Sequence, residues 1–168
     1  MTENSLNRDE NLSRTIARLA TFIASTGLSN GDRAALKRMH FGQPPPLAFY
    51  KLALRYLPTG WESDTARKDW ITIVSGMALM SPNTHRPDQS LGHALAEIRF
   101  AEARIERLLA SRDDSRRTLV LRMTRYLAAK LVACNWTEIA GLLLTRDPDR
   151  LEGLHRRIAR DFYIHQIQ

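Results

Sequence analysis

Arginine is the side chain whose abundance and spacing in this sequence point most clearly to a chemical role. Eight arginines and no lysine lie between Arg99 and Arg125, and the whole chain of 168 residues has 21 arginines against four lysines. Lysine would serve equally well for solubility, whereas the planar arginine fork can hold two oxygens of a phosphate or carboxylate at once. The bias predicts that this segment binds an anionic partner.

The overall charge favours a nucleic acid or another polyanion as that partner. The net charge is +7 and the isoelectric point is near 10.2, values typical of proteins that bind such ligands. Residues 99–130 carry nine basic and four acidic side chains, whereas residues 1–98 carry eleven and nine. Two smaller basic clusters are Arg33, Lys37 and Arg38, and then Arg156, Arg157 and Arg160. The alternative is a basic protein whose charge serves only solubility.

The residue patterns that usually carry catalysis are missing from the sequence. The five histidines include no i, i+4 pair, and there is no zinc-binding Cys-His spacing, no phosphate-binding P-loop and no glycine-rich dinucleotide turn. Asp147-Pro-Asp149 is better explained as the start of a helix than as a metal-binding pair. We therefore expect no catalytic residue, no metal, no cofactor and no small-molecule substrate.

The single cysteine and the absence of long apolar segments suggest a location in the cytoplasm. Cys134 has no partner for an intrachain disulfide, and its apolar neighbours predict a buried thiol. The first eight residues are polar, and no stretch approaches the roughly 20 apolar residues that span a bilayer. We expect a soluble protein with no membrane partner.

Hydrophobic periodicity predicts an all-α helical bundle with about eight helices. The expected helices cover residues 9–26, 31–40, 47–57, 63–80, 90–111, 113–133, 135–144 and 148–164. Residues 81–89 contain two prolines and no apolar period, so they are expected to connect an N-terminal half (1–80) to a C-terminal four-helix bundle (90–168). The alternative to this division is a single domain in which residues 81–89 form a long internal loop. Residues 1–8 are expected to be flexible.

The arginine-rich segment covers two of these expected helices. On a continuous helix over residues 90–111, one face is apolar, and an arc of roughly 160° opposite it holds a set of polar side chains. That set is His93, Glu97, Arg99, Arg104 and Arg107. The alternative is a solvated face with internal ion pairs, such as Glu102 with Arg99 or Glu106 with Arg107.

The helix over residues 113–133 is apolar almost all round, which predicts that it is the most buried helix of the bundle. Arg122 and Arg125 should emerge from it on a narrow polar strip.

Five aromatic residues lie among apolar neighbours and are expected in the core or at a subunit interface. These are Phe49, Tyr50, Trp61, Trp70 and Trp136. Without exposed aromatics among the basic residues, contacts to phosphates are favoured over base-specific recognition.

Several segments resemble the CasB family, the small subunit of the type I-E CRISPR surveillance complex (Cascade). The resemblance covers roughly residues 28–163, and the order and spacing of the segments carry it. The segments are Gly31-Asp-Arg-Ala-Ala-Leu-Lys-Arg38, Ala48-Phe-Tyr-Lys51, Gly60-Trp-Glu62, Ser90-Leu-Gly-His-Ala-Leu-Ala96 and Arg156-Arg-Ile-Ala-Arg-Asp-Phe-Tyr163.

The resemblance implies an all-helical, non-catalytic subunit in antiviral defence. Its implied partners are the backbone and large subunits of Cascade, a second copy of itself, the guide RNA–target DNA hybrid and the displaced DNA strand. The nucleic-acid contacts that it implies are Lys37, Arg38, Arg99, Arg104, Arg107 and, less closely matched, Arg112. His93 stands where relatives often have arginine, which removes a permanent charge at that position.

Two other function classes remain open at this point. A helical DNA-binding regulator would present a recognition helix, and residues 33–38 after Ser29-Asn-Gly31 could imitate its start. A pure scaffold would have no affinity for nucleic acid.

Overall fold

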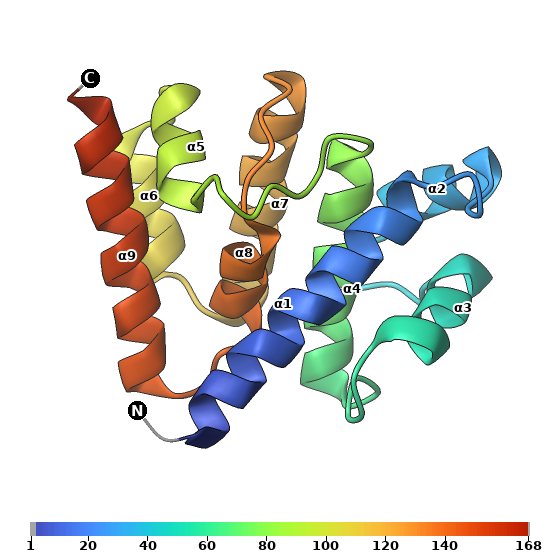
Figure 1. Cartoon of the computed structure of the whole chain (residues 1–168). Helices are drawn as coiled ribbons and strands as arrows, with labels where there is room; N and C mark the ends of the chain where they lie inside the picture. Colours follow the sequence, from blue (N-terminus) through green and yellow to red (C-terminus); the bar gives the residue numbers. More distant parts are fainter. Residues whose placement is uncertain (1–2, 168) are drawn as a thin grey trace. The chain divides into compact units, whose positions relative to one another are not determined.

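The computed structural model describes residues 3–167, and in that range the chain forms nine helices and no β-strand (Figure 1). The predicted all-α class is confirmed. The chain divides into two compact units, residues 1–85 and 86–168, so the division falls inside the segment 81–89. No helix in the described part of the chain is both long and apolar enough to cross a membrane.

Four helices form the first unit. They are α1 (Glu3–Ala24), α2 (Asn30–Lys37), α3 (Leu47–Tyr56) and α4 (Asp64–Met80). Ser29 caps α2 by accepting a hydrogen bond from the Asp32 N–H, and Ser63 caps α4 in the same way from the Ala66 N–H. Residues 69–78 of α4 are buried without interruption, so this helix is the centre of the unit.

The first helix is longer than its apolar pattern indicates. It was expected to begin near residue 9, but it begins at Glu3. Of the segment expected to be flexible, residues 1 and 2 lie outside the described residues and the other six form the first turns of α1.

Five helices form the second unit, where four were expected. They are α5 (Leu91–Glu97), α6 (Glu102–Ala110), α7 (Asp113–Ala129), α8 (Trp136–Leu144) and α9 (Pro148–Gln166). Asp147 caps α9 as predicted, with Pro148 in the first position of this helix, and Ser90, the first residue of the helix expected over 90–111, caps α5.

The continuous helix predicted over residues 90–111 is wrong, because the chain breaks between α5 and α6. The Phe100 N–H donates to the Leu95 carbonyl and the Arg99 N–H to the Ala96 carbonyl, which is the Schellman arrangement at a helix end. Arg99 takes the left-handed conformation that this motif needs, with φ of 54°. Glycine is the usual residue there, so an arginine gives no sequence signal for the break.

Phe100 provides a reason for the break. At about 100° per residue, a continuous helix would place Phe100 on the side opposite Leu91, away from the core. In the structure both side chains are buried. Ending α5 before Phe100 therefore gains the burial of a large aromatic ring.

Helices α5 and α9 lie side by side in the second unit, and Gly92 allows their close approach (Figure 1). A Cβ atom at this position would stand 2.3 Å from the Ile158 carbonyl oxygen and 2.6 Å from the Phe162 nitrogen. Because both atoms are backbone, only glycine fits here.

The expectation that residues 113–133 form the most buried helix is also wrong. Helix α8 has six of its nine residues buried, whereas α7 has seven of seventeen. Phe49, Trp61, Trp70 and Trp136 are buried as predicted, but Tyr50 is 39% exposed.

Candidate nucleic-acid interface

The eight arginines between residues 99 and 125 divide into an exposed group and a buried group. Six are exposed, and none of these forms an ion pair with another described residue. They are Arg99, Arg104, Arg107, Arg112, Arg122 and Arg125. The alternative of internal pairing, of Arg99 with Glu102 or of Arg107 with Glu106, is not found among the described residues. The Glu102 carboxylate instead accepts a hydrogen bond from the Tyr163 hydroxyl, which raises the pKa of Tyr163.

The other two arginines belong to the core. Arg116 donates to the Leu142 carbonyl at 2.9 Å and to the Leu109 carbonyl at 3.2 Å. Arg117 forms an ion pair with Asp114 at 2.7 Å, and only 4% of the Arg117 side chain is exposed. Arg116 thus links α7 to α6 and α8, Arg117 pairs within α7, and neither buried side chain is available to an external ligand.

Arg104 and Arg107 extend from α6 toward α7. The Arg104 guanidinium lies 5.0 Å from the centre of the Tyr126 ring and 5.9 Å from that of Phe100. Tyr126 is 42% exposed, although it belongs to the helix over residues 113–133, which was expected to be apolar almost all round and buried. A sequence signal was present, because Tyr126 stands one helical turn after Arg122 and should share its exposed face.

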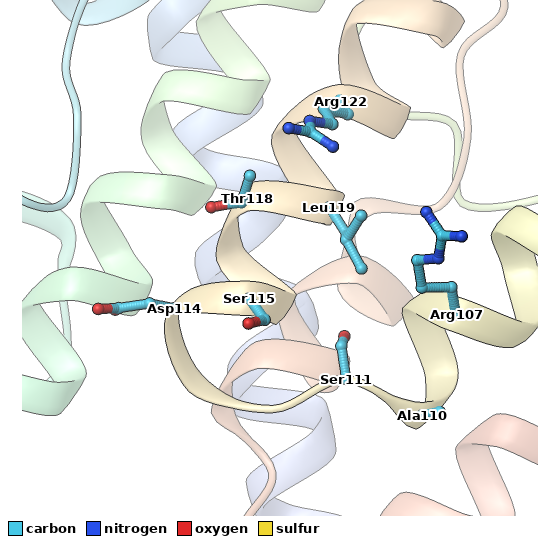
Figure 2. Close-up of a pocket in the computed structure, with 8 residues that line it drawn as sticks. All are labelled: Arg107, Ala110, Ser111, Asp114, Ser115, Thr118, Leu119 and Arg122. Carbon is cyan, nitrogen blue, oxygen red and sulfur yellow. The ribbon is translucent and has the colours of Figure 1, made fainter.

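An open pocket of about 600 Å³ lies between α6 and α7, and Arg107 and Arg122 line it from opposite helices (Figure 2). Its other lining residues include three with hydroxyl groups, namely Ser111, Ser115 and Thr118. The pocket also contains Asp114, whose carboxylate pairs with the buried Arg117 and points away from Arg107 and Arg122 in Figure 2. We call Arg104, Arg107 and Arg122 the basic surface.

Arg99 and Arg112 flank α6 at its two ends. Arg99 occupies the left-handed position between α5 and α6, so it does not share a helix face with Arg104 as the continuous helix implied. Arg112 is the N-cap residue of α7, and its carbonyl accepts the Arg116 N–H. Both are exposed, which leaves their side chains accessible to a ligand.

The two implied contacts of the first unit lie at the end of α2. Lys37 is the half-buried last residue of this helix, and Arg38 is the exposed residue that caps it. A cation is electrostatically favourable at this end of any helix, so their position also has a purely structural explanation.

Arg33, the third member of this cluster, is structural. Its guanidinium donates to the carbonyls of Ile23, Ser25 and Leu28 at 3.0, 2.9 and 3.3 Å. These carbonyls lie at or just after the C-terminal end of α1. A regulator that reads bases from residues 33–38 would lack Arg33, so this arrangement disfavours the regulator hypothesis.

In the remaining basic cluster, two of the three arginines pair with carboxylates, whereas Arg157 is exposed and forms no ion pair with a described residue. Arg156 pairs with Glu152, and Arg160 lies 3.3 Å from Asp161. His93 stacks on His165 at 3.7 Å between ring centres. His93 is therefore half-buried between α5 and α9 rather than presented to solvent.

Burial changes the pKa values of two groups in the second unit without creating a reactive site. Burial raises the pKa of the Cys134 thiol, so it stays protonated, and the predicted buried thiol is confirmed. Burial also raises the pKa of Glu138, whose carboxylate accepts the Leu91 N–H at 2.7 Å. Asn135 caps α8 by accepting the Thr137 N–H, whereas Glu138 on the same helix caps α5. Among the described residues, no group of three or more His, Cys, Asp or Glu could hold a metal ion.

Comparison with known proteins identifies the family. The sequence model for the CRISPR-associated protein Cse2 matches residues 32–163. A chain in the crystal structure of E. coli Cascade bound to a PAM-containing double-stranded DNA target shares the fold with a TM-score of 0.63 and 23% identity. That alignment covers 90% of this chain and 95% of the other. No curated protein matches the sequence. This chain therefore belongs to the Cse2 family, the small subunit of the type I-E CRISPR surveillance complex that the sequence resembled.

Proposed function

We propose that this Cse2-family subunit is non-catalytic and holds nucleic acid by its phosphates within the surveillance complex. Its ligands are the guide RNA–target DNA hybrid and the displaced DNA strand, and its protein partners are the backbone and large subunits and a second copy of itself. The observation that carries the proposal is the basic surface, because its three guanidinium groups are exposed on neighbouring helices and form no ion pair among the described residues. The double-stranded DNA in the E. coli complex supports a nucleic-acid partner.

A surface of this kind suits the energetics of target opening. Replacing DNA–DNA pairs with RNA–DNA pairs is a nearly balanced exchange, so modest contacts to the strand backbones can decide whether the duplex stays open. Arginine contacts to phosphates position a strand without reading its sequence. Arg99 and Arg112 extend the basic surface along the same unit, and Lys37 and Arg38 offer a separate contact from the first unit.

The test measures the affinity of the full-length chain for a mixed-sequence single strand over a range of salt concentrations. The test variant carries Arg104→Ala, Arg107→Ala and Arg122→Ala. The matched control carries Arg14→Ala, Arg156→Ala and Arg160→Ala, which removes the same charge from arginines that already pair with carboxylates. A variant with three lysines on the basic surface keeps the charge but loses the planar fork.

The proposal predicts that only the test variant changes the salt dependence. Each phosphate contact to a single strand contributes a slope of about −0.7, so losing three contacts should reduce the steepness by about 2. The control should keep the slope of the unmodified chain. Equal slopes for the test variant and the control would contradict the assignment of this surface.

A further inference from the structure

The face of α7 that carries Arg122 also presents an aromatic ring that the folded chain does not need to expose. Tyr126 retains 42% of its surface, and its hydroxyl forms no hydrogen bond with any described residue. Tyr163, which is exposed to a similar extent in the same unit, differs because its hydroxyl donates to Glu102. Tyr126 therefore has an accessible ring and a hydroxyl with no hydrogen-bond partner among the described residues.

Contacts with Phe100 and Arg104 hold the Tyr126 ring in place. Phe100 is buried and meets Tyr126 in an edge-to-face contact, with 5.6 Å between ring centres and 79° between ring planes. The Arg104 guanidinium lies over both rings. Phe100 is the residue whose burial ends α5, so the break in the predicted helix also fixes the position of Tyr126.

Arg107 and Arg122 would lie close to the backbone of a nucleic-acid strand whose base stacked on the Tyr126 ring. Arg122 precedes Tyr126 by four residues on α7, and Arg107 follows Arg104 by three residues on α6, so both stand about one helical turn away. Arg107 and Arg122 line the same pocket from these two helices (Figure 2). The two antiparallel helices thus place an aromatic site and a basic pocket about one turn apart along the same pair of helices.

We propose that Tyr126, together with Arg104, is a stacking site for one unpaired nucleobase, and that the pocket of Arg107 and Arg122 holds a phosphate beside it. An exposed aromatic ring next to a basic groove is the arrangement by which proteins bind single strands, and the ring accepts any base because every base has a π-face. The proposal rests on the proposed function, since it names how the basic surface engages a strand, and it assigns the site to single-stranded rather than paired nucleic acid.

The experiment compares two strands of equal length, one with bases and one abasic throughout, and measures the dissociation constant of the full-length chain for each. The test variant is Tyr126→Leu, and Tyr126→Phe keeps the ring. The matched control is Tyr50→Leu, because Tyr50 is 39% exposed and also contacts a buried phenylalanine edge-to-face. Arg107→Ala with Arg122→Ala tests the phosphate part separately.

Stacking predicts that Tyr126→Leu weakens binding of the base-containing strand by about fivefold or more and leaves binding of the abasic strand unchanged. The salt slope should not change. Tyr126→Phe and Tyr50→Leu should bind both strands as the unmodified chain does, and the double arginine variant should lose affinity for both strands alike.

A second measurement needs no variant. Ultraviolet cross-linking of the unmodified chain to a strand containing 5-bromouracil should attach the base to Tyr126, as located by mass spectrometry. Cross-links confined to other residues would contradict the stacking site and leave the phosphate contacts unaffected. The same would follow if Tyr126→Leu reduced the affinity for the base-containing and the abasic strand equally. Failure of the unmodified chain to bind either strand would overturn the proposed function and the stacking site together. If Tyr126→Leu prevented assembly into the surveillance complex but left the affinity for both strands unchanged, Tyr126 would be a protein contact, and this result would also contradict the proposal.

Discussion

Arginine side chains in this chain have two different roles, one structural and one at the exposed basic surface, and their environment in the fold distinguishes the two. Arg33 and Arg116 donate to backbone carbonyls inside their units, whereas Arg104, Arg107 and Arg122 face solvent. The same planar fork of donors serves both uses. Periodicity predicted the exposure of Arg104 and Arg107, but it gave no sign that Arg33 would close the end of another helix ten residues earlier.

Replacing Arg33 should therefore affect stability rather than nucleic-acid binding. Arg33→Ala leaves three carbonyls at the end of α1 without their charged donor, so we expect the free energy of unfolding to fall by about 1–3 kcal/mol. Denaturant unfolding measures this loss. The affinity for single strands at a temperature where the variant is folded should match that of the unmodified chain, and a drop in affinity would return Arg33 to the binding surface.

Glu138 should make stability depend on pH. Because burial raises the pKa of its carboxyl, the folded protein holds this proton more tightly than the unfolded chain, and the stabilisation is complete below the ordinary value of 4.5. It is lost as the pH rises through the folded-state pKa. Glu138→Gln keeps an oxygen for the Leu91 N–H and has no proton to lose.

The difference in unfolding free energy between Glu138→Gln and the unmodified chain should thus shift in favour of the variant as the pH rises from below 4.5 through the folded-state pKa. Thermal or denaturant unfolding at several pH values measures it. A difference that stays constant with pH would contradict the raised pKa.

At the scale of the elements, the sequence is most informative where the chain uses the usual caps. The start of α9 was predicted from Asp147 and the proline after it, and the expected starts of α4 and α5, at residues 63 and 90, coincide with the serines that cap these helices. The end of α5 was missed because Arg99 occupies a position where glycine is the usual signal, and α7 ends in the same way at Leu131, with φ of 57°. Elements with unusual caps were therefore predicted too long.

These two left-handed residues provide a matched pair of variants. Arg99→Gly and Leu131→Gly should each raise the free energy of unfolding by about 0.5–1 kcal/mol, because glycine adopts positive φ without strain. Only Arg99→Gly removes a proposed phosphate contact, so only this variant should flatten the salt dependence of single-strand binding, by about 0.7. Identical salt slopes for the two variants would exclude Arg99 from the interface.

Gly92 tests the packing of α5 against α9. A Cβ atom would overlap backbone atoms that cannot rotate away, so Gly92→Ala should cost about 2 kcal/mol or more, in the upper part of the usual range for overpacking or beyond it. Denaturant unfolding measures the cost. Gly153→Ala on α9 is the control, since nothing lies within 4 Å of its added Cβ atom.

On the scale of the whole molecule, net charge alone does not identify the binding surface. Residues 1–85 carry ten basic and seven acidic side chains, and residues 86–168 carry fifteen and eleven, so the positive excess is similar in the two units. What marks the second unit is a set of neighbouring arginines without carboxylate partners among the described residues. Family, class and most helices could be predicted from the sequence; the α6–α7 groove could not, because it depends on a helix break with no sequence signal.

The lifetime of the opened target in the assembled complex tests this account most directly. The complex is reconstituted with the unmodified chain, with the Arg104→Ala, Arg107→Ala and Arg122→Ala variant, or with the Arg14→Ala, Arg156→Ala and Arg160→Ala control, and re-annealing of the displaced strand is followed at several salt concentrations. We predict faster re-annealing and a weaker salt dependence with the first variant alone. Equal lifetimes and equal salt dependence for all three complexes would contradict the claim that the basic surface holds the strand.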